Sequence, residues 1–412
     1  MDPRRRLVLI RMGTGTLALF GGIPTGYAMP TLWNPCLSRL PAKLANHPLV
    51  DAAWQGIDPQ KVWDCHAHIA GTGDSGSGIA LSPAMSSIFH PMQFAQRLFY
   101  LNAGCADGAP GHVDQSYVAR MRQLMDDLRP GVKLMLFAFD QAHDEAGQPL
   151  PEHSAFYVPN DYAHALARTY PHYFEWVASI HPYRRDAVDA LEQVHAHGAR
   201  AVKWLPSAMG IDPAAARCLP FYQTLARLDM PLITHGGEEK AVHGVGKPEL
   251  GNPLKLRRAL DTGVRTIIAH CASIGANLDS DNGNRRVSSF SLFTRMMANP
   301  EHRDHLFGDM AAITLRNRDP AVVRTLIERE EWHSRLLNGT DYPLPGIIPL
   351  IAPASFVRAG LLAKEAVPVL RNLQAYNPLL FDFVLKRHLE ADGRRWPSCV
   401  FETRGFFEKS RT

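Results

Sequence analysis

From residue 61 onward, short apolar runs rich in β-branched residues alternate with amphipathic stretches, a pattern that predicts strands joined by helices. Each run is too uniformly apolar for a strand with one face in water, and therefore fits parallel strands covered on both faces. Eight strands are predicted: Val62–Ile69, Val132–Asp140, Phe174–His181, Ala199–Leu205, Pro231–Gly236, Arg265–Ala272, His305–Thr314 and Arg335–Asp341.

The spacing of these runs predicts how the strands are connected. Central residues of the last five, at positions 203, 235, 270, 309 and 341, follow one another at intervals of 32 to 39 residues. One strand plus one crossover helix requires about that length. Helices are predicted at Arg185–His197, Ala215–Leu228, Asn252–Asp261 and Ala321–Arg329. The pattern thus predicts an α/β fold, a closed (β/α)₈ TIM barrel, with an open doubly wound sheet as the alternative.

Two regions exceed what a minimal barrel needs. Residues 70–131 form a long insertion after the first strand, which we expect to lie over the carboxyl-end mouth as a lid or pocket wall. This insertion contains glycine-rich segments and predicted helices at Met92–Leu101 and Ser116–Leu128. Additional C-terminal helices are predicted at Ile347–Phe356, Ala363–Ala375 and Asn377–Leu389.

The first 28 residues have the features of an export signal. Arg4, Arg5 and Arg6 precede a mildly apolar stretch, and Gly26-Tyr27-Ala28 fits a cleavage site. The arginines followed by Leu7-Val8 resemble a twin-arginine signal, which predicts export to the periplasm. A disordered basic start on a cytoplasmic protein is the alternative. Residues 29–60 are interpreted as a lead-in, and residues 61–412 as the barrel with its C-terminal helices.

Charge and cysteine content narrow the class of partner. The formal net charge is +4, and without the first 28 residues 40 basic residues face 39 acidic ones. The chain after residue 28 is nearly neutral and therefore has no electrostatic field that would attract nucleic acid or anionic lipid. A small-molecule substrate is expected, and a homo-oligomer is left open. No apolar stretch beyond residue 30 is long enough to span a membrane. The six cysteines form no C-x-x-C pair, and a chain of this length needs no disulfide framework.

Metal-type side chains stand at the ends of several predicted strands. His66 and His68 are two residues apart on the first strand, so both imidazoles face the same side. The fifth strand ends in His235, the sixth in His270 and the eighth in Asp341. In a barrel these ends share one rim, and burying so many polar groups together is unfavourable unless something compensates. A divalent cation, zinc above all, suits these ligand types.

Lys203 is the sixth polar group of this rim, inside the apolar fourth strand. A lysine at such a position has to be neutralised, paired or exposed at the strand end. Two interpretations stay open: an ion pair with Asp341, or a carboxylated amine that bridges two metals.

Taken together, these motifs resemble the amidohydrolase superfamily, in particular its amidohydrolase-related branch of metal-dependent barrels. The resemblance covers roughly residues 61–390. It rests on six segments: Asp64–His68, Val202–Pro206, Ile233–Gly237, Ile268–Cys271, Gly339–Pro343 and Asn377–Phe381. Leu205 departs from the pattern, since many relatives carry a histidine there, and this puts the substrate contacts in doubt.

The resemblance implies a role for each rim residue. His66 and His68 would bind the more buried metal together with Asp341. His235 and His270 would serve a second metal, or His235 would complete a one-metal site while His270 polarises the substrate. Lys203 corresponds to the lysine that is carboxylated in two-metal members.

These roles imply a metal-activated water that cleaves an amide, lactone or ester, with Asp341 carrying the proton. The decarboxylases of the branch generally lack the lysine, so its presence favours a hydrolase. A non-oxidative decarboxylase on the same barrel is the alternative, and a non-catalytic binding barrel is the third possibility.

Substrate-binding candidates follow from position alone. Glu238 and His243 come after the fifth strand, Arg316 and Arg318 after the seventh, and His181 at the end of the third. An arginine at the mouth is able to hold a substrate carboxylate in a fork, although such residues are more often solvated loop charges.

Overall fold

A computed structural model describes residues 34–239 and 241–408 of the chain, all of them within one unit that spans Trp33–Thr412. The predicted signal segment, residues 1–28, and the start of the predicted lead-in lie outside the described residues. Each of the eight predicted strands contains an observed strand within its range. The observed strands are β1 (Trp63–His68), β3 (Lys133–Phe137), β5 (Phe174–Val177), β6 (Val202–Trp204), β7 (Leu232–His235), β8 (Thr266–Ala269), β11 (Leu306–Asp309) and β12 (Leu336–Leu337).

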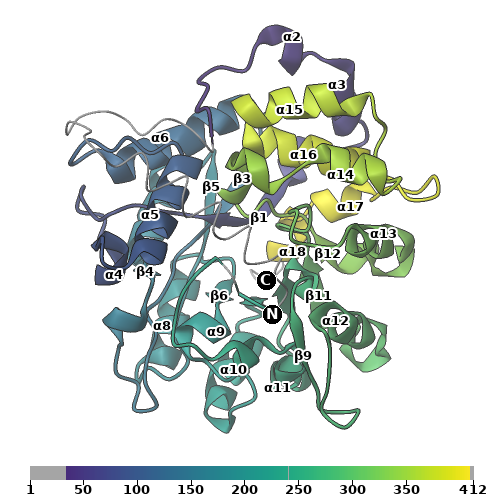
Figure 1. The fold of residues 1–412 in the computed structure, drawn as a ribbon. Coiled ribbons are helices and arrows are strands. Elements are labelled where there is room, and N and C mark those ends of the chain that lie inside the picture. Colours follow the sequence, from purple (N-terminus) through teal and green to yellow (C-terminus); the bar gives the residue numbers. More distant parts are fainter. Residues whose placement is uncertain (1–33, 240, 409–412) are drawn as a thin grey trace. The chain divides into compact units, whose positions relative to one another are not determined.

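The eight strands close into a ring of parallel neighbours. One group pairs in the order β1-β3-β5 and the other in the order β12-β11-β8-β7-β6. Two parallel bridges join the groups, Ala178 with Val202 and Ala67 with Tyr342. The His68 amide donates to the Tyr342 carbonyl at 2.9 Å, across the β1–β12 seam. The closed barrel is therefore confirmed, and it occupies the centre of Figure 1.

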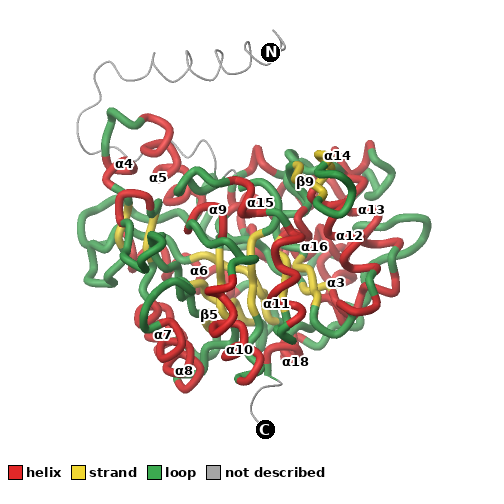
Figure 2. Tube along the Cα trace, turned by 90° about the horizontal axis from the view of Figure 1, so that it is seen from below, coloured by secondary structure: helices red, strands yellow, loops and turns green. Residues whose placement is uncertain are grey.

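Helices surround the strands, as the tube in Figure 2 shows. Four follow the predicted positions: α8 (Ala187–Ala196), α10 (Leu219–Arg227), α11 (Arg257–Asp261) and α13 (Pro320–Glu328). Two further helices, α7 (Asn160–Thr169) and α12 (Ser289–Ala298), were not predicted. The hairpin of β9 (Ala276–Asp279) and β10 (Arg285–Ser288), also not predicted, precedes α12 and interrupts the strand–helix alternation there.

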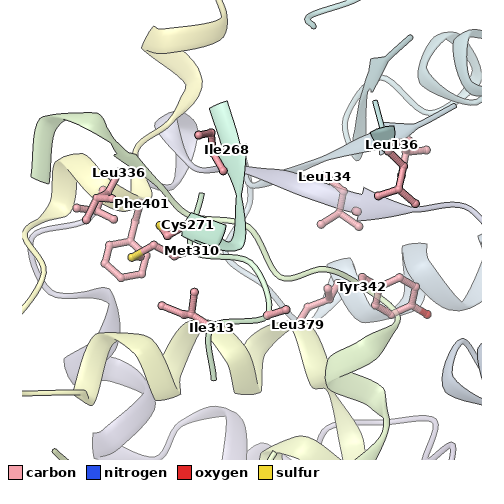
Figure 3. Packing of buried hydrophobic residues seen from close by; sticks show 14 of the residues in the cluster. Leu134, Leu136, Ile268, Cys271, Met310, Ile313, Leu336, Tyr342, Leu379 and Phe401 are labelled. Atoms are coloured by element: carbon pink, nitrogen blue, oxygen red, sulfur yellow. The ribbon is translucent and has the colours of Figure 1, made fainter. Parts of the chain in front are cut away.

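Apolar side chains pack in two layers. One layer contains side chains from most barrel strands, including Met135, Ile233 and Ile267. The other lies between the strands and the surrounding helices, where Leu134 and Ile268 are among the buried residues (Figure 3). Strands covered on both faces explain why their sequences are apolar at nearly every position.

The C-terminal helices cover the predicted lead-in. The helices α15 (Ala366–Tyr376) and α16 (Pro378–His388) match the predicted segments, and Trp54 of α3 (Pro48–Trp54) stacks on Phe383 of α16 at 4.1 Å. The predicted helix Ile347–Phe356 is wrong, because only α14 (Pro353–Arg358) and short 3₁₀ turns form there. Prolines at positions 345, 349 and 353 remove the backbone donors that a continuous helix needs.

The insertion after β1 forms a wall beside the barrel mouth, as predicted. It contains β2 (Ala80–Leu81), α4 (Pro83–Ser86), α5 (Pro91–Ala103) and α6 (Val113–Asp126), and β2 pairs with β4 (Phe156–Tyr157). Within the described part of the chain, no helix has the length and apolarity required to cross a bilayer.

A disulfide joins Cys36 to Cys105, with the two Cα atoms 5.6 Å apart. It ties the segment that leads into the barrel to the residues directly after α5. Nothing in the cysteine spacing predicts this pair, because its partners are 69 residues apart and meet only in the folded chain. Hydrogen bonding reinforces the junction, since the Asn34 side chain donates to the Ala103 carbonyl at 2.8 Å.

Candidate metal centre

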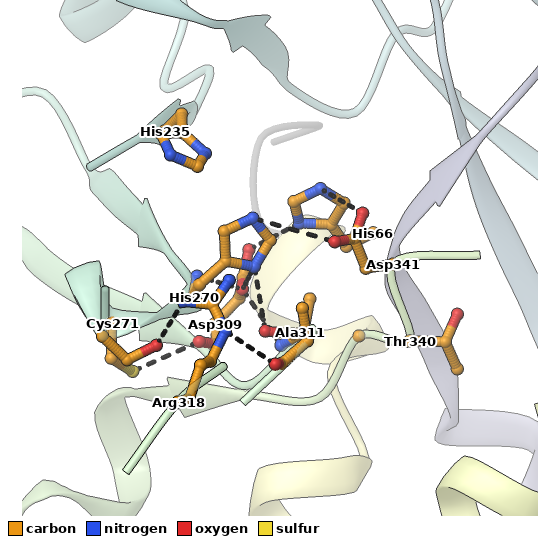
Figure 4. Close-up of polar contacts among 12 residues, drawn as sticks. His66, His235, His270, Cys271, Asp309, Ala311, Arg318, Thr340 and Asp341 are labelled. Carbon is orange, nitrogen blue, oxygen red and sulfur yellow. Dashed lines mark hydrogen bonds and ion pairs between the residues drawn. The ribbon is translucent and has the colours of Figure 1, made fainter. Parts of the chain in front are cut away.

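Three of the predicted side chains meet at the carboxyl end of the barrel. One ligand atom each from His66, His270 and Asp341 lies within 4.8 Å of the others, and all three residues are buried. Figure 4 shows the three side chains turned toward one another. His270 follows β8 directly and Asp341 lies four residues after β12, and their φ angles are positive, at 57° and 62°. Such backbone is uncommon for residues with a side chain and recurs at functional sites.

Asp309, at the end of β11, orients two of these side chains. Its Oδ2 accepts from Nδ1 of His66 at 2.8 Å, and its Oδ1 accepts from the His270 amide at 2.7 Å. Burial acts to raise the pKa of Asp309, but His66, His270 and Lys203 outweigh it and hold the pKa below its ordinary value. An ionised Asp309 makes Nδ1 of His66 the protonated nitrogen, so the lone pair of Nε2 points into the site.

In His270, too, the lone pair of Nε2 points into the site, and here a backbone carbonyl fixes the ring. Its Nδ1 donates to the Ala311 carbonyl at 2.8 Å, which leaves Nε2 unprotonated, 3.9 Å from Oδ2 of Asp341. Nε2 of His66 lies 3.5 Å from Oδ1 of the same carboxylate. Burial, followed by the charge of Lys203, lowers the pKa of His66 to about 4, so its ring is neutral near pH 7. Two lone pairs thus face one carboxylate, an arrangement that a positive ion between them stabilises.

His68 and Lys203 adjoin this group. Nε2 of His68 lies 3.1 Å from Oδ1 of Asp341. The Lys203 side chain is 1% exposed, and its ammonium lies 3.4 Å from Nε2 of His66. Burial lowers the pKa of Lys203, although Asp309 and Asp341 counteract this. The ammonium contacts an imidazole nitrogen, and the predicted ion pair with Asp341 is not among the salt bridges of the described residues.

His235 lies beside the group without joining it. Its ring centroid is 5.2 Å from that of His270, and Figure 4 shows it apart from the other imidazoles. Its Nδ1 lies 3.4 Å from Oε2 of Glu239. The other oxygen of Glu239 accepts from the amides of Ala241 and Val242, so this carboxylate connects His235 to the loop after β7.

A divalent cation fits the side chains present. Imidazole nitrogens and a carboxylate are ligands that zinc and similar ions accept, and the nitrogen lone pairs of His66 and His270 already face Asp341. Hydrogen bonds to Asp309 and to the Ala311 carbonyl supply the outer support that metal-binding histidines usually have.

A pocket opens over this centre. Its lining includes all six predicted metal-type residues, together with residues of the insertion. Helix α5 closes one side, where Gln96 Nε2 donates to the Ala241 carbonyl at 3.2 Å and the Tyr100 hydroxyl donates to the same oxygen. The insertion and the loop after β7 therefore meet across the mouth.

The predicted substrate contacts divide into two groups. Glu238 and Arg318 line the pocket, whereas His243, Arg316 and His181 are not among the described residues of its lining. His243 bonds to Gln96 at the edge of the mouth, and Arg316 is exposed. Nε2 of His181 donates to the Met209 carbonyl at 3.0 Å, and its Nδ1 accepts from the Tyr183 amide. Both ring nitrogens of His181 thus bond to the backbone, and the residue lies outside the pocket lining among the described residues.

The sequence analysis did not select Asp309, Glu239 or Tyr100. Asp309 carries the signal that identified Asp341, since it is an acidic residue that ends an apolar strand. Glu239 and Tyr100 have no comparable signal, because a loop and a helix far apart in the chain bring them to the pocket.

Reduction of the Cys36–Cys105 disulfide is expected to loosen α5, since a native disulfide typically contributes about 2–4 kcal/mol. We expect amide hydrogen exchange in α5 to accelerate at least roughly tenfold in the Cys105→Ser variant. The matched control is Cys399→Ser, which removes an exposed free thiol. Unchanged exchange in α5 would show that the disulfide does not support the pocket wall.

The buried His181 is expected to make the protein less stable in acid. Burial, followed by the charge of His143, lowers the pKa of His181 to about 3, against 6.5 in an exposed chain. Between these values the unfolded state binds more protons, so the free energy of unfolding rises with pH, by at most about 1.4 kcal/mol per unit.

The His181→Gln variant retains a donor for the Met209 carbonyl and does not titrate. We expect a shallower dependence on pH in denaturant unfolding, whereas His153→Gln, at an exposed site, should match the wild type. An unchanged slope would contradict the assignment.

Comparison with protein-family models gives no match, and comparison with curated proteins gives none either. Solved structures do match. An uncharacterised TIM-barrel protein from Bordetella bronchiseptica has 16% identity and a TM-score of 0.43, over 79% of this chain and 99% of that one. An amidohydrolase II has 14% identity and a TM-score of 0.38, over 78% and 99%. The 5-carboxyvanillate decarboxylase from Sphingomonas paucimobilis has 13% identity and a TM-score of 0.43, over 76% and 98%.

Proposed function

We propose that this protein is a metal-dependent hydrolase that cleaves an amide, lactone or ester bond of a small molecule, in keeping with its resemblance to the amidohydrolase-related branch. One observation carries the proposal. The neutral imidazoles of His66 and His270 direct their unprotonated nitrogens at the carboxylate of Asp341, at the base of a pocket. The Lys203 ammonium also lies near Nε2 of His66, at 3.4 Å, but two nitrogen lone pairs that face one carboxylate still suit a cation placed between them.

The side chains of His66, His270 and Asp341 would hold the cation, with zinc as the proposed ion. His68 would join them through Nε2 once the proton that this nitrogen donates to Asp341 is displaced. When bound, such an ion supplies an activated water and polarises the scissile carbonyl. A second ion would require Lys203 to be carboxylated, and the lowered pKa of this buried amine favours the neutral form that carboxylation needs.

Asp341 is proposed to carry the proton. Burial acts to raise its pKa, but His66, the hydrogen bond from His68 and His270 outweigh it and hold the pKa well below the ordinary value. The carboxylate is therefore ionised at neutral pH and passes an accepted proton on instead of retaining it. A water attacking from the pocket side would transfer its proton to Asp341, which would return it to the leaving group.

Decarboxylation is the second candidate, and the position of Arg318 is consistent with it. Its Nε donates to the Ala312 carbonyl and one terminal nitrogen donates to Ser273, each at 2.7 Å, so the guanidinium is fixed beside the centre. A fixed arginine that lines the pocket suits the carboxylate of a substrate. Such a contact fits a hydrolase substrate with an acidic group equally well.

Metal analysis of the purified protein, followed by a substrate screen, tests the proposal. The screen contains lactones, N-acyl amino acids, simple esters and aromatic carboxylic acids. Hydrolysis that chelation abolishes and zinc restores would support the hydrolase. Release of carbon dioxide from an aromatic acid, without any hydrolysis, would replace it with the lyase. Two metal equivalents with a carboxylated Lys203 would further favour hydrolysis.

We also propose that the protein is exported. The arginine-rich start of the chain motivates this, and the Cys36–Cys105 disulfide supports it, because disulfides persist mainly in oxidising compartments. Expression with a C-terminal tag followed by cell fractionation tests the proposal. We expect a periplasmic product that begins at Met29, and a full-length cytoplasmic product would contradict it.

A further inference from the structure

The pocket divides into a polar base and an apolar upper wall. The base contains the metal-type residues, with Glu238, Glu239 and Arg318 next to them. The wall is built largely by the insertion after β1 and by the β4 region. Its apolar and aromatic residues are Ile79, Leu81, Met85, Tyr100, Leu101 and Phe156, and Arg97 also belongs to it. Chemically distinct halves of one pocket indicate a ligand with one polar end and one apolar end.

Ring contacts hold the wall together. The ring of Phe156 lies 4.6 Å from that of Phe139 and 6.4 Å from that of Tyr100. Tyr100 also connects the wall to the opposite rim through its hydrogen bond to the Ala241 carbonyl. Strand, helix and loop therefore fix the position of the wall, which makes it a formed surface able to select a ligand.

The wall keeps apolar surface uncovered. Leu81, Leu101 and Phe156 line the pocket and are only half-buried, and so are Val242 and Leu344 from the loops after β7 and β12. Uncovered apolar surface in a pocket is covered when an apolar ligand binds. Met85, whose unbranched side chain adapts to irregular ligands, completes the wall on α4.

We infer that the upper wall is a subsite for the alkyl chain of the substrate, so that the substrate class is medium-chain acyl esters, amides or lactones. The reacting carbonyl lies at the polar base and the chain lies along the wall. The choice of reaction rests on the proposed function, whereas the chain-binding subsite does not. A chain suits the wall better than a ring that carries several polar groups, because Arg97 is the one charged residue among the described wall residues of the insertion.

A series of esters with increasing acyl chain length tests whether the wall contributes to turnover. The metal-loaded full chain is assayed with p-nitrophenyl acetate, butyrate, hexanoate and octanoate. Full transfer of one methylene from water corresponds to about a fourfold gain in kcat/KM, so we expect a rise of roughly two- to fourfold per methylene up to the octanoate. Rates that are flat with chain length, or a benzoate ester that outperforms the octanoate, would overturn the inference.

Variants of one wall residue connect the effect to this surface. Phe156→Asn should lower the ratio of octanoate to acetate kcat/KM at least roughly tenfold, and Phe156→Leu should retain most of it. The control is Leu278→Gln, which changes an exposed leucine of β9 outside the pocket lining. A ratio that is unchanged in Phe156→Asn would show that the chain lies elsewhere. Thermal melts establish that the variants are folded.

A binding measurement separates this inference from the proposed reaction. Isothermal titration of the metal-loaded protein with sodium octanoate and sodium acetate involves no turnover. We expect octanoate to bind at least roughly tenfold more tightly and Phe156→Asn to abolish the difference. If octanoate binds preferentially but no ester is hydrolysed, the chain-binding subsite is supported and the proposed function is contradicted. Equal affinity for the two anions would overturn the subsite even if hydrolysis occurs.

Discussion

The Asp341→Asn variant is expected to turn over substrate at least roughly a hundredfold more slowly than the wild type, with the barrel still folded. Asparagine preserves the shape of the side chain but is unable to accept and return the proton. One amide oxygen remains as a ligand and His66 and His270 are unchanged, so we expect most of the bound metal to be retained.

The measurement is kcat with the best substrate from the screen, together with metal content and a thermal melt. Asp212→Asn is the matched control, since it changes a partly exposed aspartate that pairs with Lys255 in an outer loop. Near-normal kcat in Asp341→Asn would remove Asp341 from its role as the proton carrier. A large loss of metal would instead assign it mainly to ligation.

The Asp309→Asn variant is expected to weaken cation binding by roughly ten- to a hundredfold, although Asp309 is not proposed to touch the ion. Its Oδ1 accepts from the amides of His270 and Ala311, so the asparagine oxygen has to remain there and its NH₂ group faces His66. Nδ1 of His66 then becomes an acceptor, and the proton moves to Nε2. A protonated Nε2 is unable to bind a metal.

Competition with a chelator of known affinity measures this effect, and His66→Asn gives the reference for loss of one ligand. Because burying an altered polar group also lowers stability, a thermal melt of the metal-free protein accompanies the titration. Wild-type affinity in a folded Asp309→Asn variant would show that the tautomer of His66 is not set by this carboxylate.

Local sequence was sufficient for the eight strands and for the side chains near their ends. Val62–Ile69 and the seven other runs predict strands because residues buried on both faces are apolar at almost every position. His66, His270 and Asp341 stand out because a polar side chain within or at the end of such a run is costly to bury unless it has a partner. The same reasoning was less informative for segments whose structure depends on distant partners, such as α12 and the short turns that replace the helix predicted at Ile347–Phe356.

Substrate contacts were the least predictable part. His181 ends a predicted strand just as His270 does, yet its nitrogens bond to the Met209 carbonyl and the Tyr183 amide. Arg318 faces the pocket whereas Arg316, two residues away, is exposed. Sequence position places such residues at the mouth of the barrel, but the direction of each side chain depends on loops that pack against it.

The chain on its own thus determined eight strands buried on both faces and a set of metal-type side chains near their ends, since both follow from burial and from the two-residue period of strands. Closure of the strands into a ring was decided by the bridges that join residues 178 with 202 and 67 with 342. Folding in three dimensions decided the rest. It fixed the protonated nitrogen of each imidazole through Asp309 and the Ala311 carbonyl, joined Cys36 to Cys105, and brought the insertion and the loop after β7 together around an apolar wall. These features depend on hydrogen bonds and packing between residues far apart in the chain. Such contacts produce no local sequence pattern from which they could be predicted.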